Sequence, residues 1–429
     1  MVDNNPFSVI NHKRRTQLNQ IKEFFICIAI IAGIMFLDRM LIDLYFFNLY
    51  GTGCMVFDIV TALHTRGFSL LKYAIPLLFV FSVIKERREF QFGMLLPIAS
   101  IYISYLLTSL FSKNIDYWRF KDFFEMPALF LLFLTLNLQT EKSAKRFFRV
   151  AVDLYIVLLT INALFRIFPQ LYEVLFPMAW PQECFLGTDN IMGPILITGM
   201  LYALLDQHIN GGKIRLSIYV ILFIINEYLI WVATALVAAI IIGFYFIPFI
   251  KRIFEKTDFL FFISLSVLLF VTLVFLFKPI SSFPPVKFII ESVLQKKVTL
   301  SGRVYLWPAV VELIVRRPIL GHGMGDSIQL FYSEYEKRSL HAHNAFLQTW
   351  YEGGLVTLFV VSGFLAYFAR ILRKMEDREL ASFFSVVMFA VLVALQADQL
   401  AFCSWYQVFI IAQIASLMPA RRFSYPSIN

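Results

Sequence analysis

Residues 216–250 read LSIYVILFIINEYLIWVATALVAAIIIGFYFIPFI, an almost unbroken apolar run. As one α-helix of about 35 residues, rising about 1.5 Å per residue, the run would be more than ~50 Å long. The hydrocarbon core of a bilayer is only about 30 Å thick. The run therefore predicts two membrane-crossing helices joined by a tight turn near residues 231–235.

The rest of the chain has the same character. Of its 429 residues, 59% are hydrophobic and only 16% are charged, and the mean hydropathy is +0.72, which is far from the composition of a soluble domain. Further apolar runs of spanning length lie at about 23–43, 67–84, 92–111, 123–138, 147–168, 191–205, 258–278, 354–369, 379–395 and 402–418. With the pair in 216–250, they predict an all-α polytopic membrane protein with about twelve transmembrane helices.

The charged residues predict the orientation of these helices. The net charge of +9 is carried largely by short basic clusters between apolar runs, which is typical of topology signals and not of a nucleic-acid-binding face. The clusters fall in every second connection, at residues 13–15, 85–88, 142–146, 213–215, 251–252, 370–374 and 421–422. We therefore expect both termini to be cytoplasmic.

One connection is much longer than the others. Residues 278–344 are expected outside the cell membrane, between nine helices in 1–277 and three helices in 345–429, all forming one membrane domain. A long outer loop of this kind usually holds structure and function of its own.

The end of that loop, SLHAHNAFLQTWYEGG at residues 339–354, holds several polar side chains just before an apolar run. Asn344 is a good helix N-cap, residues 345–352 a short helix, and Gly353 with Gly354 its stop. His343 would then lie at a helix N-terminus, which disfavours imidazolium and attracts anions. A neutral imidazole there could act as a base, although polar residues solvated at a helix entrance would give the same pattern.

His322, His341 and His343 account for three of the six histidines in the chain. His341 and His343 are two residues apart, so on a helix they would face different ways. With no carboxylate beside them, we expect no zinc site here.

The preceding segment, from residue 301, predicts an amphipathic helix along the outer membrane face. Ser301 could cap it, and Pro318 with Gly321 would end it. Arg303, near its start, could reach an anion or could only anchor the helix at the interface. The glycines of GHGMG, residues 321–325, are expected to shape a turn. Within the spans, Arg166 lies near the outer end of its helix and could point toward the same anion.

Three short segments together resemble a known signature. SGRVYLW at 301–307, RPILGHGMG at 317–325 and HAHNAFLQTWYEGGL at 341–355 are similar in order and spacing to the motifs of the O-antigen ligase and O-antigen or capsule polymerase superfamily. The resemblance implies a GT-C-like membrane glycosyltransferase. Such an enzyme moves a glycan from a polyprenyl (undecaprenyl) diphosphate carrier to an acceptor hydroxyl at the outer face of the inner membrane, with inversion and without a metal or cofactor.

The resemblance also implies roles for individual residues. By position, His343 would be the base or the residue that positions the acceptor, and Arg303 the diphosphate ligand. The other candidate substrate-binding residues are Arg166, Asn344, His341, His322 and Arg317. The partners would be the lipid-linked glycan donor, a glycan acceptor and the bilayer, with a flippase or a chain-length regulator as protein partners.

Three functions remain open from the sequence. Ligases carry an arginine in the tight outer turn between two adjacent spans, whereas that turn here, WVATAL at 231–236, has none. This departure favours a polymerase over a ligase. A transporter or flippase would also be polytopic, but it would concentrate its polar residues at the membrane midplane.

Overall fold

The computed structural model describes residues 92–113, 141–171, 185–186, 189–276, 283–295, 297, 302–324 and 341–397, together with 408, 409, 411, 412 and 415. Every secondary-structure element in these ranges is helical, in agreement with the predicted all-α class. The predicted spans at 23–43, 67–84 and 123–138, and most of 402–418, lie outside the described residues.

The described helices follow the predicted spans. They are α4 (Phe92–Ser112), α6 (Glu141–Ile167), α8 (Asp189–Asn210), α9 (Lys213–Ile230), α10 (Ala233–Phe244), α11 (Pro248–Lys256), α12 (Phe259–Phe275), α16 (Ala345–Lys374) and α17 (Arg378–Ala394). Between α12 and α16, the predicted outer loop contains α14 (Pro284–Phe288), the π-helix η2 (Ile289–Val293) and α15 (Arg303–Arg316).

Two described helices are long and apolar enough to cross a membrane, over Ala144–Ile167 and Ala345–Lys374. The bent pair α10 and α11 would make a third if it counts as one span, and α4 and α12 contain shorter apolar stretches. The chain is thus consistent with an integral membrane protein, while the number of twelve spans stays a prediction.

The run at 216–250 is divided as the sequence predicts. Helix α9 ends at Ile230, Trp231 adopts a left-handed conformation (φ 60°), and α10 begins at Ala233. The buried Glu227 stabilises this turn by accepting the Val232 N–H at 2.7 Å. In the second half of the run, Pro248 starts a separate helix, α11, bent by 88° from α10.

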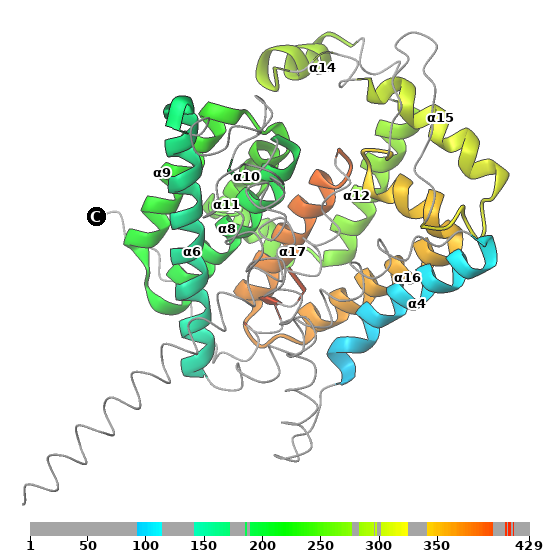
Figure 1. Ribbon diagram of the computed structural model, residues 1–429. Helices are drawn as coiled ribbons and strands as arrows, with labels where there is room; N and C mark the ends of the chain where they lie inside the picture. Colours follow the sequence, from blue (N-terminus) through cyan, green and yellow to red (C-terminus); the bar gives the residue numbers. More distant parts are fainter. Residues whose placement is uncertain are drawn as a thin grey trace, which may run out of the picture.

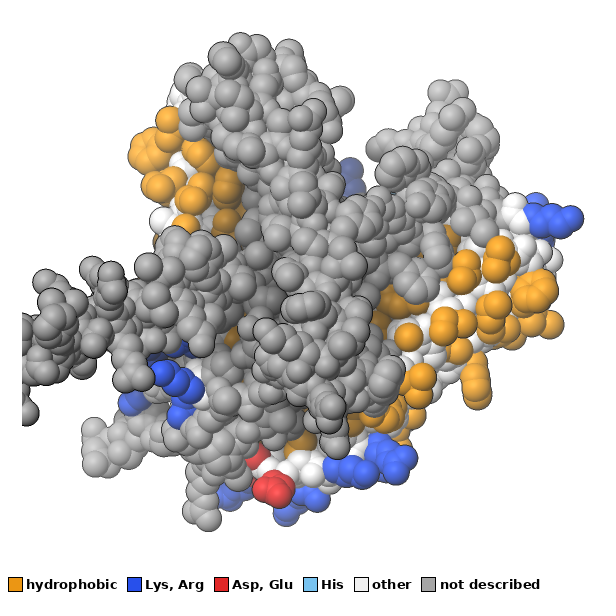
Figure 2. Space-filling model, turned by 60° about the horizontal axis from the view of Figure 1, so that its bottom comes forward, with side chains coloured by type: hydrophobic (Ala, Val, Ile, Leu, Met, Phe, Trp, Pro, Cys, Tyr) orange, Lys and Arg blue, Asp and Glu red, His pale blue; other side chains and the backbone are white. Residues whose placement is uncertain are grey.

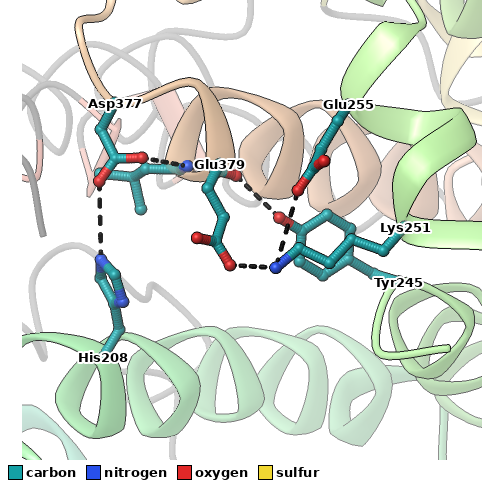
Figure 3. A network of polar contacts seen from close by, with 7 residues as sticks. His208, Tyr245, Lys251, Glu255, Asp377 and Glu379 are labelled. Atoms are coloured by element: carbon teal, nitrogen blue, oxygen red, sulfur yellow. Dashed lines mark hydrogen bonds and ion pairs between the residues drawn. The ribbon is translucent and has the colours of Figure 1, made fainter. Parts of the chain in front are cut away.

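Charged side chains at the ends of three helices lie together. Lys251 of α11 pairs with Glu379 at the start of α17 and lies 3.7 Å from Glu255, while His208 at the end of α8 lies 3.9 Å from the α17 N-cap Asp377 (Figure 3). The contacts tie α8, α11 and α17 at one end of the bundle, here called the basic end.

Helix α17 lies between two parts of the bundle. It packs against α10 and α11 on one side and against α12 and α16 on the other. Helices α6, α8 and α9 form the part that includes α10, whereas α4 and α15 pack along α16 (Figure 1). The end of α16 opposite the basic end is therefore surrounded by α4, α12, α15 and the last turn of α17.

Many hydrophobic side chains remain on the outside of this bundle. Figure 2 brings the lower part of the molecule forward and shows hydrophobic faces above a rim of Lys and Arg side chains. Large exposed apolar residues occur on α4, α9, α12 and α16, among them Phe111, Ile224, Leu268 and Phe359. Such apolar outer faces are expected of helices that contact lipid.

Candidate active site

The polar stretch at 341–352 forms the start of α16. Asn344 caps this helix, and its side-chain oxygen accepts the N–H groups of Phe346 and Leu347 at 3.0 Å each. Its amide donates to the Gln396 carbonyl at 2.9 Å, and the Ala345 N–H donates to the Leu395 carbonyl at 2.9 Å. The predicted N-cap is confirmed, and both bonds fasten the helix start to the end of α17.

His343 immediately precedes this cap and has a left-handed backbone, with φ 49°. This conformation turns its ring toward His341, so that the two ring centroids are 3.9 Å apart with an interplanar angle of 62°. The prediction that the two rings face different ways was wrong, because it assumed a helical segment. The structure brings the two imidazoles into contact.

The charge state of His343 follows from its surroundings. Burial, the neighbouring His341 and the Arg303 guanidinium together lower the pKa of His343 from 6.5 to about 3. Burial disfavours the charged ring, and positive charge on a neighbouring group disfavours a second positive charge on His343. Arg303 is thus near enough for its charge to act on the His343 ring. The structure thus joins a neutral imidazole, a cation and a helix N-terminus.

We expect the pH profile of kcat/KM to lack an acidic limb near pH 6.5, because kcat/KM reports groups of the free enzyme. With its pKa lowered to about 3, the His343 ring stays neutral well below pH 6.5. In the unfolded chain the ring would protonate near pH 6.5, so its stabilising contribution is full above pH 6.5 and declines as the pH falls toward 3. Rates measured between pH 4 and 8 would test this, and a limb centred near 6.5 would contradict it.

The backbone of Ala342, the residue before His343, is held by two side chains. The Ala342 carbonyl accepts the indole N–H of Trp307 at 3.1 Å, and the Ala342 N–H donates to the Gln348 side chain at 2.8 Å. Sequence reasoning missed Trp307 and Gln348 as site residues. Both residues lie inside the quoted motifs, and this is the one feature of the sequence that could have indicated them. A buried indole N–H or a buried side-chain amide needs a hydrogen-bond partner, which is why such residues fix their surroundings.

Helix α15 brings Arg303 and Trp307 to this place. Its N-cap is Gly302, with φ 91°, which corrects the prediction that Ser301 caps it; Ser301 lies outside the described residues. Leu306, Trp307, Val310 and Ile314 form its buried face. This face packs on α12 and on the start of α16, as expected for an amphipathic helix.

Two further candidates lie at the end of α15. Arg317 is exposed and follows the last helical residue. The His322 ring stacks on Tyr351 with centroids 4.6 Å apart, and its Nε2 is 2.9 Å from the Leu313 carbonyl. Because that carbonyl can only accept, Nε2 carries the proton. His322 therefore helps to fasten α15 to α16, and a role in binding substrate stays a prediction.

Gly321 and Gly323, the described glycines of the GHGMG segment, shape a turn, as predicted, and this turn meets a break in α16. Gly354 has φ 64° and ψ −169° inside α16, so the helix is kinked where the sequence predicts a stop. The N–H groups of His322 and Gly323 donate to the carbonyls of Tyr351 and Glu352 at 2.7 and 2.9 Å. The loop thus supplies hydrogen bonds to two carbonyl groups that lose their partners within the helix at the kink.

Arg166 lies elsewhere in the bundle. It is in the last turn of α6, which packs against α8 and α9, whereas α15 packs against α12 and α16. One turn before it, the buried Asn162 donates to Asn226 of α9 at 2.9 Å. Whether Arg166 shares an anion with Arg303 remains a prediction. Over the described ranges, no group of three or more His, Cys, Asp or Glu side chains could hold a metal ion.

Part of the chain is similar to a known protein family. Residues 216–362 match the family model described as O-Antigen ligase, whereas no curated protein matches the chain. The matched range includes the turn at Trp231, helix α15 with Arg303, and the start of α16 with His341 and His343. Over residues 216–362, about a third of its length, the chain is similar to the O-antigen ligase family, which supports the O-antigen ligase and polymerase superfamily that its motifs predict.

Proposed function

We propose that this protein is a polymerase that joins polyprenyl-diphosphate-linked oligosaccharide repeat units into a surface polysaccharide. Its family indicates an O-antigen ligase- or polymerase-like enzyme acting on lipid-linked glycans in a membrane. The observation that carries the proposed transfer chemistry is the neutral His343 imidazole just before α16, within reach of the Arg303 charge. This is a base and a cation in one place, as glycan transfer from a diphosphate carrier requires.

The proposed step is an inverting displacement at the anomeric carbon. The acceptor hydroxyl oxygen forms the new bond to that carbon while the bond from carbon to the diphosphate oxygen breaks, and its electron pair leaves with the polyprenyl diphosphate. His343 takes the hydroxyl proton, and Arg303 offsets the charge on the leaving diphosphate. A positioned base contributes about 10² to 10⁴ in rate, and arginine binds phosphate through strong charge-assisted hydrogen bonds.

The low pKa of His343 in the empty site is compatible with its role as the base, because donor binding would raise that pKa. In the empty site the ring is a weak base, because its protonated form is disfavoured by Arg303 and by burial. A bound diphosphate brings negative charge, which neutralises Arg303 and favours imidazolium. The base would therefore strengthen when the donor arrives.

The choice of polymerase over ligase rests on the turn between α9 and α10. This turn consists of Trp231 and Val232 and offers no basic side chain, whereas ligases resembling this chain carry an arginine there. The family description, O-antigen ligase, favours ligase as the second candidate. A transporter fits less well, because the polar groups near His343 gather at the start of α16 and not at the middle of the bundle.

One assay separates these functions. Purified full-length protein in lipid nanodiscs would be given polyprenyl diphosphate carrying one repeat unit, with no nucleotide, no ion gradient and EDTA present. A polymerase lengthens the lipid-linked glycan, whereas a ligase produces nothing until a separate acceptor is added. A transporter forms no product in either case, and a product lost with EDTA and restored by a divalent cation would overturn the metal-independent step.

We expect Arg303→Ala to lower kcat by about 10² to 10³, the usual cost of removing one charge-stabilising donor from an active site. Arg303→Lys should recover only part of this, because lysine keeps the charge but not the planar fork. Both rates would be measured with the lipid-linked donor, with the exposed Lys287→Ala as a control that should keep wild-type activity. Equal small losses in all three variants would leave Arg303 as an interfacial anchor.

A further inference from the structure

We propose that Gln348, oriented by Glu352 and assisted by Trp307, is the positioning residue that holds His343 in place for the transfer step. The proposal rests on the proposed function, and it concerns a residue that does not itself contact the reacting groups. Three buried side chains and the backbone of one residue, Ala342, carry the argument.

The starting point is the backbone of His343. A left-handed conformation costs a residue with a side chain roughly 1–2 kcal/mol, so the surrounding contacts must enforce it. On its C-terminal side, the cap at Asn344 fixes the chain. On its N-terminal side, the only residue between the two imidazoles is Ala342, which is fully buried.

Both polar groups of Ala342 are held by side chains. Trp307, from α15, donates to its carbonyl, and Gln348, one turn into α16, accepts its N–H. Trp307 and Gln348 are themselves buried, with 1% and 0% exposure, so water cannot replace either bond. The position of His343 is therefore coupled to both helices.

Glu352 determines which end of the Gln348 amide faces Ala342. The Gln348 Nε2 donates to Glu352 Oε1 at 2.7 Å, one turn further along α16. A carboxylate accepts hydrogen bonds, so the NH₂ group must face Glu352, and this leaves Oε1 for the Ala342 N–H. Glu352 is buried as well, so it keeps this order fixed.

The first experiment separates positioning from packing. Gln348→Met keeps the side-chain volume but loses both bonds; we expect kcat for a polyprenyl-diphosphate-linked oligosaccharide to fall about 10- to 100-fold, because misplacing a catalytic group by about 1 Å has effects of that size. The donor KM should change little. Tyr219→Phe is the control: its hydroxyl donates to the Leu196 carbonyl at 2.7 Å inside the bundle, so its loss should lower the thermal midpoint but not kcat.

A second variant gives a pH signature that packing alone would not produce. In Gln348→Glu, the new carboxyl and Glu352 would share one proton at acid pH, because two adjacent carboxylates resist double ionisation. The protonated form repeats the glutamine pattern, donating to Glu352 and accepting from Ala342. Relative to wild type, kcat of Gln348→Glu should therefore rise as the pH falls from about 8 to about 5.

A readout without turnover keeps the inference distinct from the proposed function. In protein labelled at histidine ¹³Cε1 and reconstituted in nanodiscs, the His343 signal, assigned with His343→Asn, should stay neutral from pH 8 to 5. Gln348→Met should raise its titration midpoint toward the ordinary value, and Tyr219→Phe should not. If wild type transfers no glycan but these shifts occur, the function is wrong and the positioning stands. Unchanged titration and kcat in Gln348→Met would overturn the positioning role.

Discussion

His343→Ala should lower turnover by a factor of about 10² to 10⁴, the range that a positioned base contributes, while the protein stays folded and still binds the lipid-linked donor. Loss of a base changes the transition state more than the ground state, so kcat should fall and the donor KM should change little. The measurement is glycan transfer by purified protein in nanodiscs, with donor binding followed separately.

The left-handed backbone of His343 requires a second variant. Alanine lacks the tolerance for positive φ that asparagine has, so a defect in His343→Ala alone could come from the backbone. His343→Asn accepts this conformation but offers no base, and it should be as inactive as His343→Ala. His341→Ala removes a ring that contacts His343 and helps to lower its pKa, so its effect should be intermediate. Near-normal turnover by His343→Asn would show that these histidines are only solvated polar residues.

Local signals predicted the parts of the fold that depend on a few neighbouring residues. The length of the run at 216–250 required a turn, and the turn lies at Trp231. Asn344 was predicted as a cap because its side chain serves the N–H groups two and three residues later. The break at Gly354 was expected from glycine chemistry alone. The cap and the break are each decided within about one helical turn of sequence, and the turn by the length of one continuous apolar run.

Features fixed by distant contacts could not be predicted in the same way. The contact between His341 and His343 depends on the left-handed backbone of His343, and distant residues hold the residues on either side of it. Trp307, some 35 positions earlier in the chain, binds the Ala342 carbonyl, and the Gln396 carbonyl, some 52 positions later, binds the Asn344 side chain. No pattern near residue 343 indicates either partner. The start of helix α11 could have been predicted from local sequence, because proline favours the first position of a helix and Pro248 occupies it. It was overlooked because Pro248 lies inside a long apolar run.

These distant contacts also connect the site to the break in α16. The first part of α16 carries the cap, Gln348 and Glu352, and it ends at Gly354. Beyond the break, the N–H groups of Leu355 and Val356 donate to the carbonyls of Pro318 and Ile319, at 2.9 and 3.2 Å. This loop follows directly after α15, which carries Arg303. The hydrogen bonds at the break therefore hold α15 against α16 and fix the position of Arg303 relative to His343.

Gly354→Ala should therefore be the most damaging single-methyl change in this part of the molecule. At φ 64° and ψ −169° its backbone lies in a region that essentially only glycine adopts. A Cβ there would overlap the Ile319 carbonyl group and would lie 2.6 Å from the Gly321 nitrogen. We expect a loss of at least about 2 kcal/mol in stability, seen as a lower thermal midpoint and reduced yield of folded protein.

Gly363, in the same helix, provides the matched control. An added Cβ at Gly363 would meet nothing within 4 Å, so Gly363→Ala should be neutral or stabilise by about 0.5–1 kcal/mol through helix propensity. Gly321→Ala, facing Gly354 across the break with φ 69°, should resemble Gly354→Ala, since its Cβ would lie 2.5 Å from the Glu352 carbonyl oxygen. The three variants would be compared by thermal unfolding in one detergent. A Gly354→Ala protein as stable as Gly363→Ala would show that α16 can straighten, and the position of Arg303 relative to His343 would then not depend on the break.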